Sequence, residues 1–187
     1  MTTIKLGRRH FTAGAAAGAA SFGLPALAQG EPIKVGVIFP LSGPAGPNGQ
    51  GVAHAVSIAA EMINAKGGVL GRKIVVVAKD DESTPAVGVT RANEMVAEKV
   101  AVVIEGWNSP VTLAMQPVLA RADILDITAV SKADPILAGT ANPYAVRINS
   151  SNGQDGAVIA DILANHLGAK RIGFLSQNDA TATARRR

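Results

Sequence analysis

The sequence predicts an α/β protein built on a doubly wound parallel sheet. Short runs of apolar, mostly β-branched residues have the pattern of strands that are covered on both faces. Between them, apolar residues recur every three or four positions, which is typical of amphipathic helices. The connections are long enough for right-handed parallel crossovers, so the order β-α-β-α-β-α-β implies one sheet between two layers of helices.

The first strand, Ile33–Phe39, ends at Pro40, which cannot continue a ladder of hydrogen bonds. A Gly/Pro-rich loop over residues 41–50 follows it. Beyond this loop, the spacing predicts a helix that Gly67 ends. Its predicted apolar face consists of Val52, Val56, Ala59, Met62 and Ile63.

The second strand, residues 73–78, leads into an acidic run over residues 80–82. This run is interpreted either as a cation site or as solvated charge at a turn and helix start. Thr84 and Pro85 are typical of an N-cap followed by the first helical residue, and they predict a helix to about Glu98. The predicted apolar face of this helix consists of Val89, Ala92, Met95 and Val96.

The third strand, residues 100–104, is followed by the most informative loop of the chain. Ser109 is the expected N-cap and Pro110 the expected first residue of the next helix. Trp107 and Asn108 lie between this strand and this helix, at the carboxyl end of the strand, where open α/β sheets bind ligands. A helix start leaves backbone N–H groups free, which suits an anion such as a carboxylate.

The fourth strand, residues 124–128, completes the first lobe, which we expect to span residues 29–148. After it, Asp134 and Pro135 indicate a short helical turn, and Tyr144 to Ile148 a short strand or crossing segment.

Residues 149–187 read as a polar crossover and the start of a second α/β lobe. They contain a predicted helix over residues 155–167 and a predicted strand over residues 171–176. One helix and one strand cannot bury both faces of a new sheet, so we expect either a truncated chain or a tail that is out of frame.

The first 28 residues predict an export signal that is cleaved after Ala28. Arg8 and Arg9, with Phe11 behind them, resemble the twin-arginine class, and an ordinary secretory signal is the alternative. The apolar run of this segment is shorter than a membrane span of about 20 residues. We therefore expect a periplasmic protein.

Charge and cysteine content narrow the function classes. The predicted signal carries three of the 18 basic residues and none of the 14 acidic ones, so the mature chain is nearly neutral. A neutral chain lacks the electrostatic basis for binding nucleic acid. There is no cysteine, so an exported form depends on its apolar core rather than on disulfides.

No catalytic motif is evident. The chain has no phosphate loop, no dinucleotide fingerprint and no nucleophile elbow around Ser109. His54 and His166 stand alone on predicted helices, so neither a metal site nor a cofactor is expected. The loops at the carboxyl ends of the strands instead carry hydroxyls, amides and glycines, which bind polar ligands without reacting. The candidate ligand-binding residues are Ser42, Asn48, Trp107, Asn108, Ser109 and Ser131.

Some of these candidates have a purely structural interpretation as well. Ser109 is either an N-cap or a ligand contact. Trp107 either covers an apolar edge or offers a stacking surface. Asn48 is either a turn residue or a ligand contact.

A family resemblance rests on several segments: PLSGPAGPNGQG at residues 40–51, INAKGGVLGRK at residues 63–73, DDESTP at residues 80–85, IEGWNSPVTLAMQP at residues 104–117 and YAVRINSSNGQDG at residues 144–156. With them the chain closely resembles the ABC-transporter solute-binding proteins of the branched-chain amino acid type, with the type I periplasmic binding fold. The resemblance covers about residues 33–178. It implies a two-lobed receptor that closes on its ligand, with the chain crossing between the lobes near residues 147–150.

By position in this family, Ser109 resembles the group that binds the ligand carboxylate, and Ser131 lies in the loop that resembles the ammonium-binding segment. Asn48 stands where some members have an aromatic residue, and Trp107 lies beside the carboxylate site. These two departures leave aliphatic amino acids, aromatic acids and amides open as ligands.

The resemblance implies a monomer that delivers a small ligand to an ABC permease in the inner membrane. The alternatives are a ligand-sensing receptor or regulator of the same fold and, from another class, an α/β enzyme.

Overall fold

The computed structural model describes residues 30–138 and 142–173. The predicted export signal over residues 1–28 lies outside them. The elements in chain order are β1 (Ile33–Phe39), α2 (Gly46–Ala65), β2 (Ile74–Asp80), α3 (Pro85–Ala97), β3 (Val102–Glu105), α4 (Ser109–Arg121), β4 (Leu125–Thr128), α5 (Pro135–Ala138), β5 (Ala145–Arg147), α6 (Asn152–Asp161) and the π-helical turn Ile162–His166. No helix in the described part of the chain is long and apolar enough to span a membrane.

The strands form one five-stranded sheet in the order β2-β1-β3-β4-β5, and every pairing is parallel. The predicted fold class is therefore confirmed. The inner strand β1 pairs with β2 over its whole length, from Ile33 opposite Ile74 to Phe39 opposite Asp80. On its other side it pairs with β3, with Val35 opposite Val102. The segment after residue 144, left open as a strand or a crossing segment, adds β5 to the edge of the same sheet.

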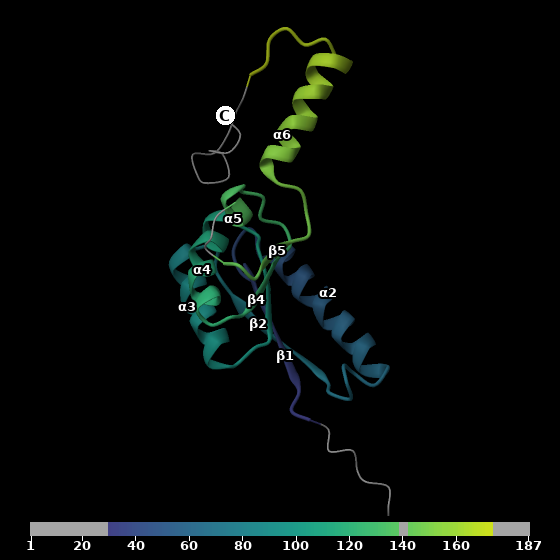
Figure 1. The fold of residues 1–187 in the computed structure, drawn as a ribbon, viewed down its shortest axis with the longest axis vertical. Coiled ribbons are helices and arrows are strands. Elements are labelled where there is room, and N and C mark those ends of the chain that lie inside the picture. The colour runs from purple at the N-terminus through teal and green to yellow at the C-terminus, as the bar shows by residue number, and fades with distance from the viewer. Residues whose placement is uncertain (1–29, 139–141, 174–187) are drawn as a thin grey trace, which may run out of the picture. The chain divides into compact units, whose positions relative to one another are not determined.

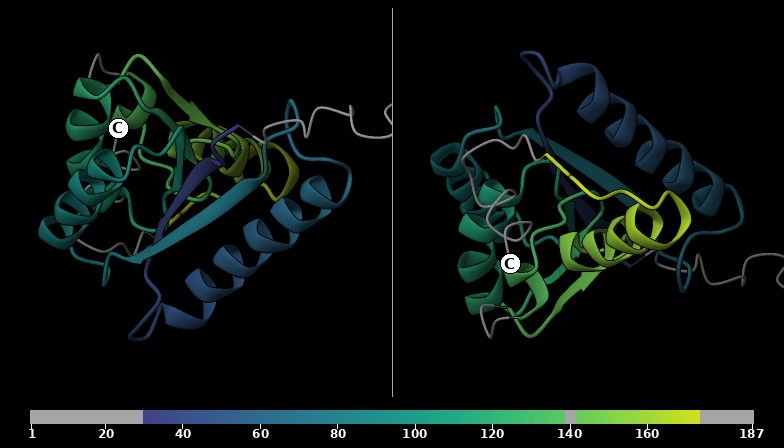
Figure 2. Two further views of the ribbon diagram at one scale, coloured as in Figure 1. Left: turned by 90° about the horizontal axis from the view of Figure 1, so that it is seen from below. Right: turned by 90° about the horizontal axis from the view of Figure 1, so that it is seen from above.

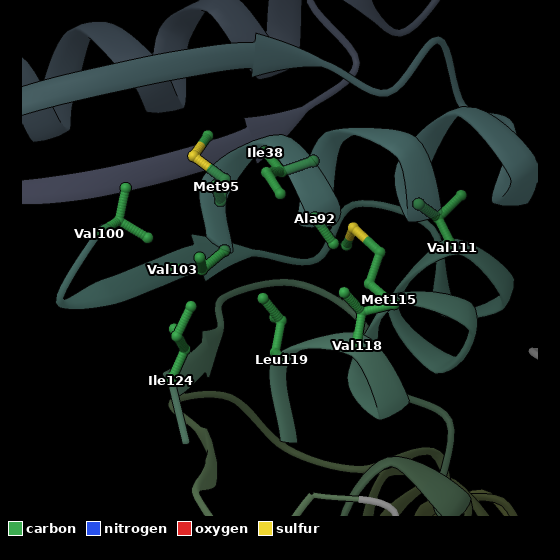
Figure 3. Packing of buried hydrophobic residues seen from close by; sticks show 10 residues of the cluster. All are labelled: Ile38, Ala92, Met95, Val100, Val103, Val111, Met115, Val118, Leu119 and Ile124. Atoms are coloured by element: carbon green, nitrogen blue, oxygen red, sulfur yellow. The ribbon is translucent and has the colours of Figure 1, made fainter. Parts of the chain in front are cut away.

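Helices cover both faces of the sheet (Figures 1 and 2): α2 lies on one face, and α3 and α4 lie side by side on the other. The apolar core lies between the sheet and the pair α3 and α4 (Figure 3). Its buried side chains come from β1, β3 and both helices and point toward one another. They include Ile38, Met95, Val103, Met115 and Leu119. As predicted, α3 turns its Ala92 side inward, with Val89 and Val96 at the border of the core.

The α2 prediction is wrong in two respects. The helix begins at Gly46, inside the predicted loop, so Asn48 belongs to its first turn. The buried residues of the helix are Gly46, Gly49 and Ala60, whereas Val52 and Val56 of the predicted face are half-buried and Met62 is 59% exposed. At Gly49 the helix approaches the end of β1 closely, since a Cβ there would stand 2.0 Å from the Pro40 carbonyl oxygen.

The second lobe's predicted elements need correction as well. The helix predicted from residue 155 begins at Asn152, because Ser151 and Gln154 form a capping box. Residues 171–173 are exposed and form no strand, so the strand prediction is wrong there, and residues 174–176 lie outside the described part. The division into lobes at residue 148 stays a prediction.

Candidate ligand-binding site

The candidate site lies where the connections of the sheet diverge. From β1 the chain runs through α2 to β2 on one side, and it returns through α3 to β3 on the other side of β1. The loops after β1 and β3 therefore leave neighbouring strand ends toward opposite faces of the sheet. In open α/β sheets such a switch point opens the crevice in which ligands bind.

The loop after β1 and the first turn of α2 each supply one of the predicted residues, Ser42 and Asn48, and both are exposed. Ser42 hydrogen-bonds the carboxylate of Asp80, whose Oδ1 also accepts the N–H groups of Leu41 and Glu82 at 2.8 Å each. Partial burial raises the pKa of Asp80, but these hydrogen bonds outweigh it and keep the pKa below its ordinary value. Ser42 thus ties its loop to β2, whereas Asn48 is exposed in the first turn of α2.

The other side of the candidate site is formed by the loop after β3, residues 106–108, hereafter the β3 loop. Gly106 adopts φ +107°, and a Cβ there would stand 2.1 Å from Thr128 Oγ1, so only glycine fits. Trp107 and Asn108 are half-buried. The N-cap of α4 is Asn108, and Ser109 is the first helical residue, so the N-cap prediction for Ser109 is wrong by one position.

Ser109 has a different partner from the one expected of an N-cap. Its Oγ accepts two backbone N–H groups, those of Lys132 and Ala133, at 3.2 Å each. These residues belong to the segment after β4, residues 129–134, hereafter the β4 loop. Ser131 of this loop donates its N–H to the Gly106 carbonyl at 2.7 Å. The structure therefore joins the β3 and β4 loops into one continuous wall.

The two serines lie inside this wall. Ser109 is 3% exposed and Ser131 is 1% exposed. The Oγ of Ser131 lies 2.8 Å from Thr112 Oγ1. Of the predicted residues on this side of the crevice, Trp107 and Asn108 expose side-chain surface. At the start of α4 the N–H groups of Val111 and Thr112 donate to the Asn108 carbonyl at 3.0 and 3.1 Å, and Pro110 has no N–H.

A buried pair of acids beneath the wall was missed by the sequence analysis. Glu105 and Asp126 lie on adjacent strands, where Glu105 pairs with Thr128 and Asp126 with Val103, and they are 0% and 1% exposed. Thr112 donates its hydroxyl to Glu105 Oε2 at 2.6 Å. Within the described residues, Glu105 Oε1 and both Asp126 oxygens have no hydrogen bond of ordinary geometry. The available signal was an acid inside each of the apolar runs VVIE and ILDIT.

Burial governs the charge of this pair. It raises the pKa of Glu105 well above the ordinary value, and the neighbouring Asp126 raises it further. Burial also raises the pKa of Asp126 to about 6.

The other titratable candidates form no reactive cluster in the described part of the chain. No group of three or more His, Cys, Asp or Glu there is arranged to hold a metal ion. The structural interpretation of the acidic run as solvated charge is wrong for Asp81, which is buried and accepts the N–H of Ser83 at 2.8 Å. Burial raises the pKa of Asp81. His54 and His166 are exposed on helical segments away from the strand ends.

The β4 loop also contacts the segment after β5. The Lys132 ammonium lies 2.7 Å from Asp155 Oδ2 and 3.2 Å from Ser150 Oγ. The Asn149 amide donates to the Val130 carbonyl at 2.8 Å. The wall is thereby linked to the predicted crossover between lobes.

Comparison with known proteins identifies relatives that are periplasmic or amino-acid-binding proteins. A family model described as periplasmic binding protein matches residues 32–186. A Leu/Ile/Val-binding protein of Rhizobium johnstonii is 30% identical over 161 residues, which cover 86% of this chain and 43% of that protein. A Leu/Ile/Val-binding protein homolog of Brucella melitensis is 29% identical over 163 residues, covering 87% and 44%. The chain thus spans less than half the length of these curated relatives.

Solved structures share the fold. The branched-chain amino acid transporter substrate binding protein of Streptococcus pneumoniae, in complex with isoleucine, has a TM-score of 0.67 and 25% identity over 73% of this chain and 39% of its own. A solute binding protein of an ABC transporter from Rhodopseudomonas palustris, in complex with 3,4-dihydroxybenzoic acid, has a TM-score of 0.70 and 27% identity over 82% and 41%.

Proposed function

The chain belongs to the periplasmic binding protein family, and on that premise we propose that it is an extracytoplasmic receptor that delivers an amino acid or a related small carboxylate or amide to an ABC importer. The observation that carries the proposal is the switch point between β1 and β3. This point combines the exposed amide of Asn48, the indole of Trp107 and the start of α4. Together these groups bind a small polar ligand without a nucleophile or a metal.

The carboxylate is the part of the ligand that this site suits best. The start of α4 offers the positive end of the helix dipole and the N–H of Ser109, since Pro110 has no N–H and those of Val111 and Thr112 donate to the Asn108 carbonyl. Asn108 adds an amide at the same position. The hydroxyls of Ser109 and Ser131 hold the wall that carries these donors, so their role toward the ligand is indirect in the present conformation.

The rest of the ligand stays open between two chemistries. The structural relatives hold isoleucine in one case and 3,4-dihydroxybenzoic acid in the other, and the two ligands share a carboxylate. In this chain Trp107 offers an aromatic surface beside the helix start, and Asn48 offers a polar group across the crevice. Stacking on Trp107 favours an aromatic acid, while the relatives named for Leu/Ile/Val binding favour an aliphatic amino acid.

Location and partners follow from the same premise. We propose export to the periplasm through a signal over residues 1–28, cleavage after Ala28, and function as a monomer that docks on an ABC permease. Residues 29–148 would form the first lobe and residues 149–187 the crossover and the beginning of the second. Closure of two lobes on a ligand would present a joined surface to the permease.

Calorimetry tests the proposal with L-isoleucine, L-leucine, 4-hydroxybenzoate and 3,4-dihydroxybenzoate as probes. Saturable binding of at least one probe, with the probe recovered unchanged, is the expected result. Chemical turnover of a bound probe that is lost in Ser109→Ala would favour an α/β enzyme instead. Permease and ATPase genes beside the coding region would favour transport over a sensor of the same fold.

A further inference from the structure

Glu105 reaches the β4 loop by two routes. Its backbone carbonyl accepts the N–H of Ala129 at 2.8 Å. Its side chain accepts the hydroxyl of Thr112 at 2.6 Å, and Thr112 Oγ1 lies 2.8 Å from the Oγ of Ser131. The chain Glu105–Thr112–Ser131 thus connects the end of β3, the first turn of α4 and the β4 loop.

This chain of side chains is sealed from solvent. Glu105 and Thr112 are 0% exposed and Ser131 is 1% exposed. Water cannot replace a partner that is lost at such a depth, so each hydrogen bond is costly to break. The first member of this chain, Glu105, directly precedes the β3 loop, which carries Trp107 and Asn108.

We propose that Glu105 is a positioning residue of the ligand site, which acts through Thr112 and Ser131 to hold the β4 loop against the β3 loop. The proposal rests on the proposed function only in treating these two loops as a wall of the ligand site. The hydrogen-bond chain itself does not depend on it.

The charges around Glu105 suit this role. The acids that face it are Asp126 from β4 and, more weakly, Asp81 from the end of β2, and the hydroxyls of Thr112 and Thr128 oppose their effect. Burial, followed by the effect of Asp126, raises the pKa of Glu105 well above its ordinary value. A carboxyl with a raised pKa repels Asp126 less once it takes up a proton, and in either form it accepts the hydroxyl of Thr112.

Hydrogen exchange in the ligand-free chain, followed by NMR, tests the positioning role. The reporters are the amides of Ala129, Val130 and Ser131, which donate to carbonyls of Glu105 and Gly106. Thr112→Val removes the bridging hydroxyl at constant shape, and Thr112→Ser keeps it. Glu105→Leu removes the side-chain acceptor of the Thr112 hydroxyl, whereas Glu105→Gln keeps a side-chain oxygen that accepts it.

The expected result is exchange faster by about fivefold or more at these three amides in Thr112→Val and Glu105→Leu, which corresponds to one lost buried hydrogen bond. Thr112→Ser and Glu105→Gln should restore protection. The control is Thr90→Val on α3, where the hydroxyl only donates to the Ala86 carbonyl, and it should match the wild type. Unchanged exchange in Thr112→Val would overturn the proposal, and so would an equal acceleration at the amides of β1.

A second arm measures the affinity for L-isoleucine and 4-hydroxybenzoate by calorimetry. A bound probe should bind about fivefold more weakly to Thr112→Val than to Thr90→Val. Equal affinities would overturn the positioning of the ligand site. If neither probe binds the wild-type chain, the proposed ligands fail, while the exchange measurement still decides whether Glu105 positions the loop.

Discussion

The hydroxyl of Ser109 accepts the backbone N–H of Lys132 at 3.2 Å, across 23 positions of sequence. It accepts the N–H of Ala133 at the same distance. A single side-chain oxygen at the start of α4 therefore holds the β4 loop in place. This contact explains why a serine beside the crevice is buried rather than open to a ligand.

Ser109→Ala should destabilise the fold by about 1–3 kcal/mol, because it leaves two N–H groups of the β4 loop without their acceptor. Urea unfolding measures this loss as a lower midpoint at an unchanged slope. The matched control is Ser57→Ala on α2, where the hydroxyl only donates back to the Ala53 carbonyl. That change should stay within about 0.5 kcal/mol. Equal stability of Ser109→Ala and the wild type would contradict the joined wall.

Gly106→Ala should cost at least about 2 kcal/mol, from a strained φ of +107° and from the clash of its Cβ with Thr128. The control is Gly51→Ala in α2, where a Cβ meets nothing within 4 Å. Alanine there should stabilise the protein by about 0.5–1 kcal/mol through helix propensity. Thermal unfolding of the two variants separates local strain from the general effect of adding a methyl group, and a neutral Gly106→Ala would count against the described loop.

The buried acid pair predicts a particular pH dependence of stability. The folded pKa of Asp126 is raised to about 6, so the folded state holds a proton that the unfolded state releases near its ordinary value of 3.8. This contribution is fully present below the unfolded pKa, and it is lost as the pH rises through the folded pKa. The free energy of unfolding should fall between pH 4 and pH 7 by on the order of 2 kcal/mol relative to Asp126→Asn.

Asp126→Asn removes this titration while it keeps the shape of the side chain. Denaturant unfolding at several pH values provides the comparison. Asp80 and Glu94, whose pKa values are lowered, contribute a trend of opposite sign in both proteins, so the difference between the two proteins isolates the pair. Parallel pH curves for wild type and variant would show that Asp126 does not titrate in this range.

Trp107 should decide between aromatic and aliphatic ligands. Trp107→Ala should weaken 4-hydroxybenzoate binding by about 1–2 kcal/mol, whereas Trp107→Phe should keep most of the affinity, because a ring remains for stacking. L-isoleucine should lose less in both variants. Calorimetry gives these differences directly, and equal losses for both ligands in Trp107→Ala would argue that the indole only covers an apolar edge.

The fold was predictable because its signals are local. β1 and α3 combine strong strand or helix periodicity with clear ends, such as Pro40 and the pair Thr84 and Pro85. The start of α2 was missed because Gly46 and Pro47 are typical of loops, and a proline in the first turn of a helix has the same local signature as a turn.

The placement of the candidate loops at the strand ends was predictable, but their contacts in atomic detail were not. Topology alone places Asn48 and Trp107 at the strand ends beside the switch point. The inward role of Ser109 depends on contacts with residues 132–133, which no local pattern encodes. The pairing of Glu105 with Asp126 requires the register of β3 and β4, which appears only once the sheet is formed.

The most direct test of the central claim locates a bound carboxylate by NMR in the wild-type chain. L-isoleucine and 4-hydroxybenzoate are titrated alongside isoleucinamide and methyl 4-hydroxybenzoate, which lack the carboxylate. The account predicts that at least one acid shifts the amides of Trp107, Asn108 and Ser109, together with that of Asn48, and that its uncharged derivative does not. Shifts confined to other parts of the sheet, or equal shifts from acid and derivative, would contradict a carboxylate site at the switch point between β1 and β3.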